Sequence, residues 1–395
     1  MTTIRPRVVR SEDSIWVLTP GNALRAENTP EYFGWSDADI IAELPDLAGV
    51  DIAGTGVHHV TVTTTTSCNL ACPYCFQNTA PADGGGLAPR IARRFIDLSV
   101  IRAAAQFVND RAGKHNAHSL ALTLFGGEPL LRPDLCATIL REFGSFLPLS
   151  ASAVTNGTRL SARTLASLRA LGLDQLQVSL DGGKSSHDVT RRTRGGHPTY
   201  DHVLENIRKA AMVEGVLWNF RLNVTASSVS TILSAVEDIA SLSFADAPIV
   251  SLDLIHDAGV YDGTVAWGDD ALDACVEAYE RAIDLGLQIP EPAWSAPCAM
   301  CGDVECETGT VVDADGSVVS CWEAVGHPEL TLGDVWGARL SPEKRRTRWR
   351  QCGFSATDGA PQRRIRSDLD ARVLDLLREK GRLGTGSTES GQTHG

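Results

Sequence analysis

A repeated alternation of strand and helix patterns constrains this chain most. Between residues 60 and 285, six short apolar and β-branched segments alternate with six amphipathic helical segments. The strand patterns cover residues 60–65, 120–125, 151–154, 176–180, 220–224 and 249–255, and the helical patterns cover residues 89–108, 133–146, 160–171, 201–213, 229–240 and 270–285. Parallel strands need long crossovers, which helices usually provide. The alternation predicts an α/β domain, either a partial (β/α)6 TIM-like barrel or an open doubly wound sheet.

The segments on either side of this repeat have different patterns. Residues 1–57 hold an apolar run at 14–18 and a helical pattern from Asp37, which predicts an accessory segment before a barrel over residues 58–286. Residues 287–355 are rich in cysteine and predict a separate small domain, in which Asp315-Gly316 lies between β-branched runs and indicates a hairpin. Residues 356–395 are predicted to form a helix and then a disordered tail, because residues 380–395 are mostly Gly, Ser and Thr.

Charge and hydropathy exclude several classes of protein. The chain has 36 Lys and Arg against 49 Asp and Glu, a net charge of −13, so a nucleic acid is not expected as a partner and a neutral or basic substrate is favoured. No stretch of about 18 residues is uniformly apolar and no signal core follows Met1, so we expect a cytoplasmic protein with no membrane partner. Ten cysteines in a reducing compartment indicate ligands more readily than disulfides. Cys136 and Cys275, on apolar helix faces, are instead predicted to be core residues.

Three of the cysteines form one tight cluster. Cys68, Cys72 and Cys75 follow the first predicted strand and precede the first predicted helix. Active sites of parallel α/β folds lie at this carboxyl end of the strands. Three thiolates can bind three irons of a cubane 4Fe–4S cluster and leave the fourth iron open to a small ligand. The alternatives are a zinc site, which would need a fourth ligand from elsewhere in the chain, and buried structural thiols.

The cysteine loop resembles the signature of a known family. Its Cys-x3-Cys-x2-Cys spacing, with Tyr74 before the last cysteine, is similar to that of the radical S-adenosylmethionine (radical SAM) enzymes. Gly126-Gly127-Glu128 follows the second strand and resembles the family's Gly-Gly-Glu motif, which contacts the amino group of the methionine moiety. The glycines would let the backbone approach the ligand, and the carboxylate of Glu128 would pair with the ammonium.

Polar residues at the next two strand ends extend the resemblance. Asn156 follows the third strand, Ser179 ends the fourth, and Arg191 comes shortly after it. In the family, polar residues at such positions bind the ribose or carboxylate of the cofactor, although Arg192 or Arg194 could serve in place of Arg191 here. Each motif alone is compatible with an ordinary turn or helix entry. Because all of them fall at successive strand ends, the resemblance implies the radical SAM partial barrel, a 4Fe–4S cluster and S-adenosylmethionine.

A second set of cysteines lies beyond the barrel: Cys298, Cys301, Cys306, Cys321 and Cys352. The spacing Cys306-x9-Gly316-x4-Cys321 resembles the SPASM or twitch extension that holds auxiliary clusters in one branch of the family. The full SPASM pattern continues with closely spaced cysteines, whereas here only Cys352 follows Cys321.

Five cysteines can complete one four-thiolate cluster and not two. The prediction is an auxiliary 4Fe–4S cluster on Cys301, Cys306, Cys321 and Cys352, with Cys298 as an alternative ligand or a partial second site. Zinc is the rival metal, because Cys298-x2-Cys301 is also a zinc-binding pair.

The resemblance also implies the chemistry. Such an enzyme cleaves S-adenosylmethionine reductively to a 5′-deoxyadenosyl radical, which abstracts hydrogen from the substrate, and a flavodoxin or ferredoxin is the expected electron donor. Many members of the branch modify ribosomally made peptides, so oxidative modification or cross-linking of such a peptide is the leading prediction. The alternatives are a dehydrogenase of a small molecule, an amino sugar or alcohol, and a non-catalytic metal-binding protein.

Two further residue assignments follow from that prediction. A family member can use a carboxylate just after the Cys-x9-Gly-x4-Cys unit as a base; Trp322 stands there, with Glu323 one residue on, so Glu323 is the catalytic candidate. The run at residues 14–18 is a candidate strand edge for docking a leader peptide, or part of a lid over the barrel.

Overall fold

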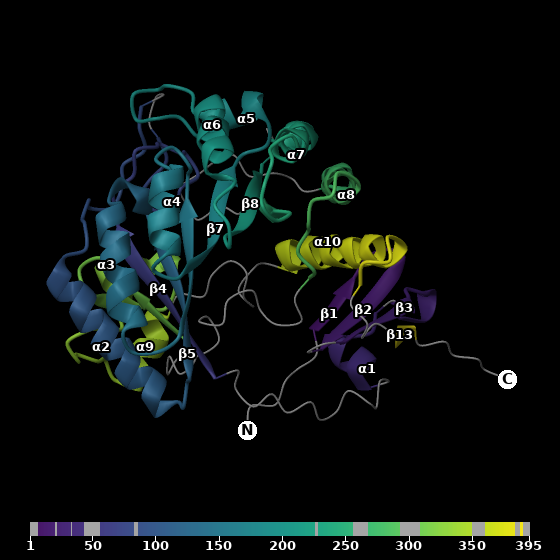
Figure 1. Cartoon of the computed structure of the whole chain (residues 1–395). Coiled ribbons are helices and arrows are strands. Elements are labelled where there is room, and N and C mark those ends of the chain that lie inside the picture. The colour runs from purple at the N-terminus through teal and green to yellow at the C-terminus, as the bar shows by residue number, and fades with distance from the viewer. Residues whose placement is uncertain are drawn as a thin grey trace.

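A computed structural model describes residues 7–19, 22–32, 34–42, 56–82, 86–225, 228–255, 268–292, 309–349, 360–383 and 388–389. A nine-stranded sheet forms the centre, and a four-stranded sheet lies to one side of it (Figure 1).

Six parallel strands form most of the central sheet, and their order in space follows their order in the chain. They are β4 (Val57–Thr65), β5 (Ser119–Gly126), β6 (Leu149–Thr155), β7 (Leu173–Leu180), β8 (Leu217–Val224) and β9 (Ile249–Leu254). A doubly wound sheet would reverse its strand order at a switch point. The uninterrupted order therefore confirms the partial barrel and rules out the doubly wound alternative.

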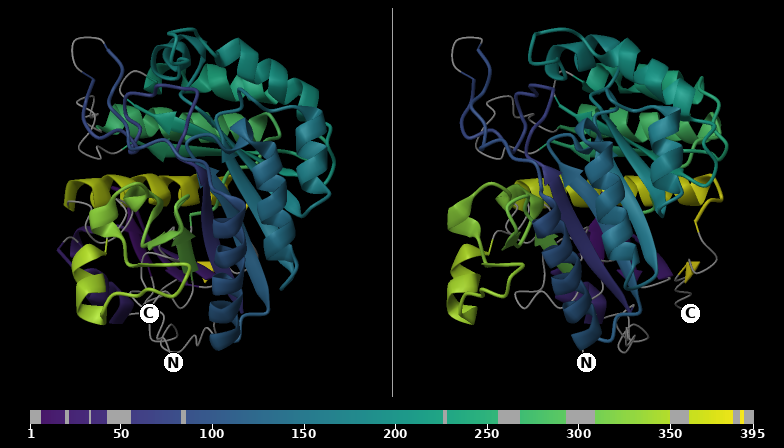
Figure 2. Two further views of the ribbon diagram at one scale, coloured as in Figure 1. Left: turned by 90° about the vertical axis from the view of Figure 1, so that its left-hand side faces the viewer. Right: turned by 60° about the vertical axis from the view of Figure 1, so that its left-hand side comes forward.

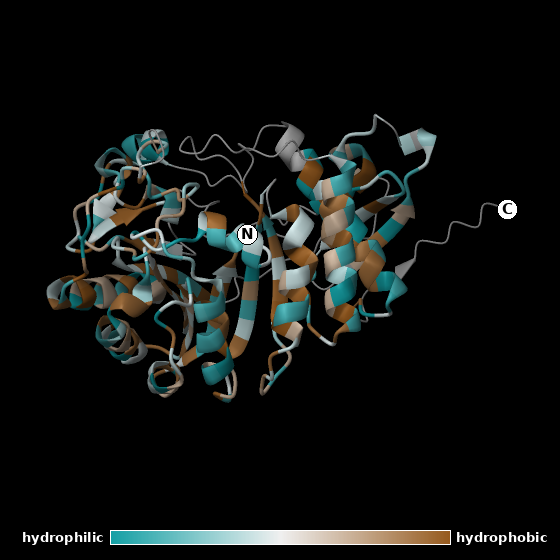
Figure 3. Cartoon of the chain, turned by 90° about the horizontal axis from the view of Figure 1, so that it is seen from above, coloured by the Kyte–Doolittle hydropathy of each residue, from teal (hydrophilic) through white to brown (hydrophobic). Residues whose placement is uncertain are grey.

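Helices connect these strands and pack on the sheet. They are α2 (Leu98–Lys114), α3 (Pro133–Gly144), α4 (Ala162–Arg169), α5 (Lys184–Thr190), α6 (Tyr200–Ala210), α7 (Ile232–Ala240) and α8 (Asp269–Asp284), with 3-10 turns η3 (Pro129–Leu131) and η4 (Val229–Thr231). Each buries one face; α6, for example, buries Val203, Ile207 and Ala210, which lie one or two turns apart. Figure 3 shows hydrophobic residues along the central strands and on one side of the covering helices. Cys136 and Cys275 are buried in this core, as predicted.

The helix after the cysteine loop begins later than its pattern predicts. The prediction placed it from residue 89, whereas α2 starts at Leu98, where Asp97 caps it by accepting a hydrogen bond from the Val100 amide. The preceding residues run beside the loop instead, with isolated β-bridges from Arg90 to Asn78 and from Phe95 to Thr65. This segment becomes one wall of the site.

The predicted C-terminal hairpin is confirmed, but it is not a separate sheet. β10 (Gly309–Val312) and β11 (Ser317–Val319) pair antiparallel across a turn in which Gly316 has φ 90°, a conformation that favours glycine. β10 also pairs parallel with β4, and β12 (Gly333–Asp334) pairs antiparallel with β11, so the hairpin continues the barrel sheet. It is followed by η5 (Trp322–Ala324), η6 (Pro328–Leu330) and α9 (Pro342–Arg348), which lie on the same side of the molecule as α2 (Figure 2).

The N-terminal segment forms a second unit. β1 (Arg7–Arg10), β2 (Ser14–Thr19) and β3 (Asn22–Glu27) make an antiparallel meander, followed by η1 (Pro30–Tyr32) and α1 (Asp37–Ala42). The C-terminal helix α10 (Ala360–Glu379) lies between this meander and α8, as Figure 1 shows, and β13 (Thr388–Glu389) pairs parallel with β3. Of the tail predicted as disordered, the structure describes residues 380–383 and β13, and the remainder lies outside the described residues.

One prediction about this unit is wrong. Residues 14–18 belong to β2, which pairs with β1 on one side and β3 on the other, so they offer no strand edge to a peptide.

Among the helices that the structure describes, none combines the length and apolar character needed to cross a membrane.

Asp375 of α10 ties the helix to the meander. Its carboxylate accepts hydrogen bonds from Ser14, from Trp16 Nε1 at 3.2 Å and from Arg25 Nε at 2.7 Å. Asp375→Ala is expected to lower the free energy of unfolding by about 2–3 kcal/mol, since hydrogen bonds to a charged group contribute on this scale. Denaturant unfolding and limited proteolysis of the first 30 or so residues measure the effect. Glu379→Ala, on the exposed side of the same helix, is the control, and equal unfolding midpoints for the two variants would contradict the prediction.

Candidate active site

The three clustered cysteines line one cavity at the carboxyl edge of the barrel. Burial raises the pKa of Cys72 to about 12 and also raises the pKa of Cys68. Thiolates at these positions therefore need a strongly positive partner, which a metal centre provides. Among the described residues, no three His, Cys, Asp or Glu side chains are placed to hold one metal ion. In a cubane cluster each thiolate binds a different iron. Three thiols that line one cavity, without converging on a single metal position, therefore fit such a cluster.

Backbone hydrogen bonds hold the cysteine loop on both sides. On one side, Ile91 N donates to Gln77 O at 3.1 Å. On the other, Ala71 N donates to Arg192 O at 3.0 Å, and the Arg194 amide donates to Asn69 O at 3.1 Å. The loop is therefore fixed between the segment before α2 and the segment after α5.

Two of the three thiols accept hydrogen bonds from neighbouring groups. Arg90 Nη1 lies 3.5 Å from Cys75 Sγ, and the same guanidinium donates to Gln77 Oε1 at 2.8 Å. Cys68 Sγ accepts from Leu70 N at 3.4 Å and from Asn156 Nδ2 at 3.8 Å. Hydrogen bonds to cluster sulfurs influence the reduction potential, and a charged donor has the strongest effect. Arg90 is a site residue that no sequence motif indicated.

Gly126 and Gly127 are required by the close approach of the cysteine loop. A Cβ on Gly126, whose φ is 139°, would lie 2.1 Å from Thr65 O, and a Cβ on Gly127 would lie 2.2 Å from Ser67 O. In place of side chains there are backbone hydrogen bonds: Gly127 N donates to Thr65 O at 2.7 Å and Glu128 N to Ser67 O at 3.0 Å. Both glycines line the cavity, so bare backbone faces the ligand space there.

Glu128 has a structural role in addition to the one predicted for it. Its side chain is fully buried and does not line the cavity, and its two oxygens accept hydrogen bonds from Leu130 N, Thr155 Oγ1 and Asn156 N at 2.7–2.9 Å. Burial raises the pKa of this carboxyl, against the opposing effect of those hydrogen bonds. In this structure Glu128 joins the ends of β5 and β6, and its predicted pairing with a ligand ammonium stays a prediction.

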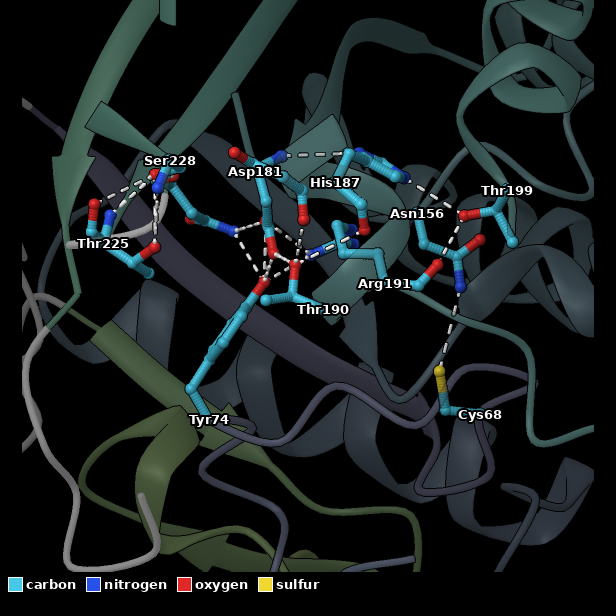
Figure 4. Close-up of polar contacts among 12 residues, drawn as sticks. Cys68, Tyr74, Asn156, Asp181, His187, Thr190, Arg191, Thr199, Thr225 and Ser228 are labelled. Carbon is cyan, nitrogen blue, oxygen red and sulfur yellow. Dashed lines mark hydrogen bonds and ion pairs between the residues drawn. The ribbon is translucent and has the colours of Figure 1, made fainter. Parts of the chain in front are cut away.

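A buried polar network lies beneath the cavity (Figure 4). Tyr74 donates from its hydroxyl to Asp181 at 2.6–2.7 Å, Asn223 Nδ2 donates to the same carboxylate at 3.0 Å, and Thr190 also donates to it. Arg191 Nη1 reaches the Tyr74 hydroxyl at 3.0 Å and Asp181 at 3.5 Å. Burial raises the pKa of Tyr74 well above its ordinary value. The network fixes the cysteine loop and Arg191 on the same anchor, the fully buried Asp181.

Arg191 has a donor left over for a ligand. It is 7% exposed and lines the cavity, and its buried Nε has no hydrogen-bond partner in the part of the chain that the structure describes. An unsatisfied guanidinium donor beside a ligand cavity matches a carboxylate, such as that of a methionine moiety. Asn156 and Ser179 line the same cavity, as the sequence predicted. The donor set therefore fits a 4Fe–4S cluster and S-adenosylmethionine.

The C-terminal segment supplies the opposite wall. Glu323 is 8% exposed and lines the cavity together with Trp322, so the predicted catalytic candidate and the cysteine loop share one space. Trp322 stacks on Phe125 with ring centroids 5.1 Å apart, and Phe125 stacks on Phe76 at 6.1 Å. Sequence reasoning did not indicate this aromatic stack, because its members come from three distant parts of the chain.

The predicted auxiliary site falls mostly outside the described residues. Cys298, Cys301, Cys306 and Cys352 lie there, whereas Cys321 is buried directly after the β10–β11 hairpin and before Trp322. The choice between an auxiliary iron–sulfur cluster and zinc therefore stays a prediction.

A partial barrel with a three-thiol loop at its carboxyl edge, an unsatisfied Arg191 donor and bare glycine backbone fits the class of domains that hold an iron–sulfur cluster and a small cofactor with a carboxylate. Residues 62–216 match the Radical SAM superfamily. The chain therefore carries a Radical SAM domain over these residues, and this domain family implies a 4Fe–4S cluster and S-adenosylmethionine.

Several curated proteins are similar in sequence. AdoMet-dependent heme synthase of Methanosarcina barkeri is 33% identical over 165 residues, 41% of each chain. Mycofactocin maturase MftC of Mycobacterium tuberculosis is 24% identical over 283 residues, 69% of this chain and 66% of the maturase. The match thus spans less than two thirds of either relative. A probable GTP 3′,8-cyclase of Methanopyrus kandleri is 27% identical over 336 residues, 82% of this chain and 99% of the cyclase.

A solved structure supports the fold. Native anSMEcpe with bound AdoMet and Kp18Cys peptide superposes with a TM-score of 0.60 at 18% identity, over 83% of this chain and 100% of that one.

Replacing Arg90 tests the hydrogen bond to Cys75. In Arg90→Gln, the reduced cluster loses a charged donor, so its midpoint potential is expected to fall by about 60 mV if that hydrogen bond favours the reduced state tenfold. A redox titration followed by electron paramagnetic resonance measures this shift independently of turnover. Arg94→Gln changes an exposed arginine on the same segment and should leave the potential unchanged. A wild-type potential in Arg90→Gln would show that the contact does not tune the cluster.

Proposed function

We propose that this chain oxidatively modifies or cross-links a ribosomally made peptide. The observation that carries the proposal is that Glu323 and Trp322, from the segment after the barrel, line the same cavity as the cysteine loop. A buried carboxylate facing the cluster loop suits an oxidation, in which the substrate loses a proton as well as a hydrogen atom. The names of two similar proteins, a mycofactocin maturase and an enzyme crystallised with a peptide, also support a peptide substrate.

Each part of the site has a role in this proposal. Cys68, Cys72 and Cys75 hold the cluster, and the Gly126–Gly127 backbone, Asn156, Ser179 and Arg191 hold the cofactor. When bound, the cluster and S-adenosylmethionine together supply a carbon-centred radical that removes a hydrogen atom from the substrate. The aromatic stack of Trp322, Phe125 and Phe76 excludes water from this side of the cavity, which protects such chemistry from side reactions.

Glu323 completes the oxidation. After a hydrogen atom has left the substrate, a two-electron oxidation still requires the loss of one electron and one proton. Glu323 would accept the proton, and an auxiliary 4Fe–4S cluster, held by Cys301, Cys306, Cys321 and Cys352 with Cys298 as the alternative ligand, would supply the electron acceptor. Cys321 directly precedes Trp322 in the chain, so one ligand of such a cluster would come from the segment that forms this wall of the cavity.

A small-molecule substrate is the second candidate. It is favoured by the similarity to a probable GTP 3′,8-cyclase, which this chain matches over almost the whole length of the cyclase. Modification of a precursor peptide would support the peptide candidate, whereas turnover of a small molecule without any leader sequence would support the second candidate.

Anaerobic reconstitution tests the cluster content. The wild type is expected to bind about eight irons, and the triple variant Cys68→Ala/Cys72→Ala/Cys75→Ala about four. Only the wild type should release 5′-deoxyadenosine under strong reduction, because the triple variant has no cluster at which the cofactor binds. Zinc in the wild type would refute the auxiliary cluster, and release of 5′-deoxyadenosine by the triple variant would refute the role of the loop.

Mass spectrometry of precursor peptides encoded beside this chain tests the substrate and Glu323 together. The wild type should remove hydrogen from the peptide, visible as a mass loss or a cross-link. In Glu323→Gln, product formation should fall about 100-fold or more, the scale of a lost general base, while 5′-deoxyadenosine is still released. Glu329→Gln, an exposed glutamate of η6, is the matched control. Unchanged product from Glu323→Gln would remove its role, and binding of no such peptide would favour the small-molecule candidate.

A further inference from the structure

Arginines gather around the cysteine loop although the protein as a whole is acidic. The two segments that flank the loop carry Arg90, Arg93 and Arg94 on one side and Arg192 and Arg194 on the other. Elsewhere the balance is the reverse, since the chain has a net charge of −13. Positive charge is therefore concentrated where the barrel carries its cluster loop.

Three of these guanidinium groups lie close enough to repel one another. We call Arg90, Arg93 and Arg194 the arginine rim. The pKa of Arg194 is lowered first by partial burial and then by Arg93 and Arg90, whereas nearby Cys68 has the opposite effect. The rim thus spans the loop from the Cys75 side, where Arg90 donates to the thiol, to the Cys68 side, where the backbone of Arg194 binds Asn69.

No carboxylate neutralises the rim within the described part of the chain. None of its three arginines takes part in an ion pair there, although exposed arginines elsewhere do, such as Arg132 with Asp134 and Arg281 with Glu237. Arg93 is exposed and Arg194 is half-buried. Like charges held together without a counter-charge cost free energy, and an anionic partner would offset that cost.

We propose that the arginine rim is the docking surface for an acidic one-electron carrier protein. The proposal rests on the Radical SAM domain and not on the identity of the substrate. One electron leaves the reduced carrier and enters the cluster, so the carrier is oxidised by one electron and the cluster is reduced by one. Docking at the rim places the carrier over the loop that holds the cluster. Complementary charge raises the association rate of weak, transient complexes of this kind.

An acidic peptide substrate is the competing occupant of the rim, because Arg90 also lines the cavity. Two features favour the carrier. Arg93 and Arg194 do not line the cavity, and Arg93 is exposed beside the loop, where a partner on the protein surface can reach it.

The test measures how fast reduced flavodoxin is oxidised by the reconstituted enzyme, without peptide, in an anaerobic stopped-flow instrument. The double variant Arg93→Glu/Arg194→Glu leaves Arg90 and the thiols intact. Its second-order rate at low salt is expected to fall about tenfold or more relative to wild type, and raising the salt concentration should slow the wild type but not the variant. Excess dithionite needs no docking surface, so it should reduce the cluster to the same final extent in both.

A matched control carries the same change in charge at the other end of the barrel. Lys114→Glu/Arg141→Glu alters exposed residues in the last turns of α2 and α3, and should oxidise flavodoxin at the wild-type rate. A wild-type rate in the rim variant would overturn the proposal, and so would an equal loss in the control. A smaller final extent of reduction of the rim variant by excess dithionite would also overturn it, because the damage would then lie in the cluster. Weaker binding of an acidic peptide with unchanged flavodoxin oxidation would assign the rim to the substrate.

Discussion

The close backbone contact between the Gly126–Gly127 turn and the cysteine loop is the constraint on which the site depends. The turn at the end of β5 donates two amide hydrogen bonds to Thr65 O and Ser67 O, at a separation that leaves no room for a side chain. The loop is thereby attached to the neighbouring strand as well as to its own. Because both strands belong to a packed parallel sheet, the rigid barrel core holds the thiols in fixed positions.

Two buried carboxylates extend this attachment around the barrel. Glu128 links the ends of β5 and β6, and Asp181, after β7, gathers Tyr74 from the loop and Asn223 from β8. Neither carboxylate is exposed, and each is surrounded by donors, which is what makes a buried acidic group tolerable. The acidic residues of the motifs thus hold the strand ends in place, while Arg191 and the glycine backbone face the ligand.

Sequence alone predicted the parts of this arrangement that depend on local pattern. Buried parallel strands have long apolar runs, so all six were found, and the thiol loop was evident from its spacing. A motif gives a residue type and not its contacts, so the hydrogen bonds from the end of β6 to Glu128 were not predicted. An apolar run such as residues 14–18 has the same sequence pattern in a central strand as in an edge strand, so its position in the sheet could not be predicted. Ile91 and Phe95 have the spacing of apolar residues on one face of a helix, so a helix was predicted from residue 89. Their segment instead pairs with the loop. The Asp181 network joins residues far apart in the chain, which no local pattern reveals.

The parallel pairing of β10 with β4 has a mechanical consequence. Thr310 lies opposite Val60 in the register of the sheet, so the hairpin that leads to Cys321, Trp322 and Glu323 is bonded to the same strand that carries the cysteine loop. The two walls of the cavity are therefore attached to neighbouring, hydrogen-bonded strands of one sheet and not to two domains joined by a hinge. The spacing between them is set by the hydrogen-bond register of the sheet, so the width of the cavity is fixed by the backbone and not by the packing of separate domains.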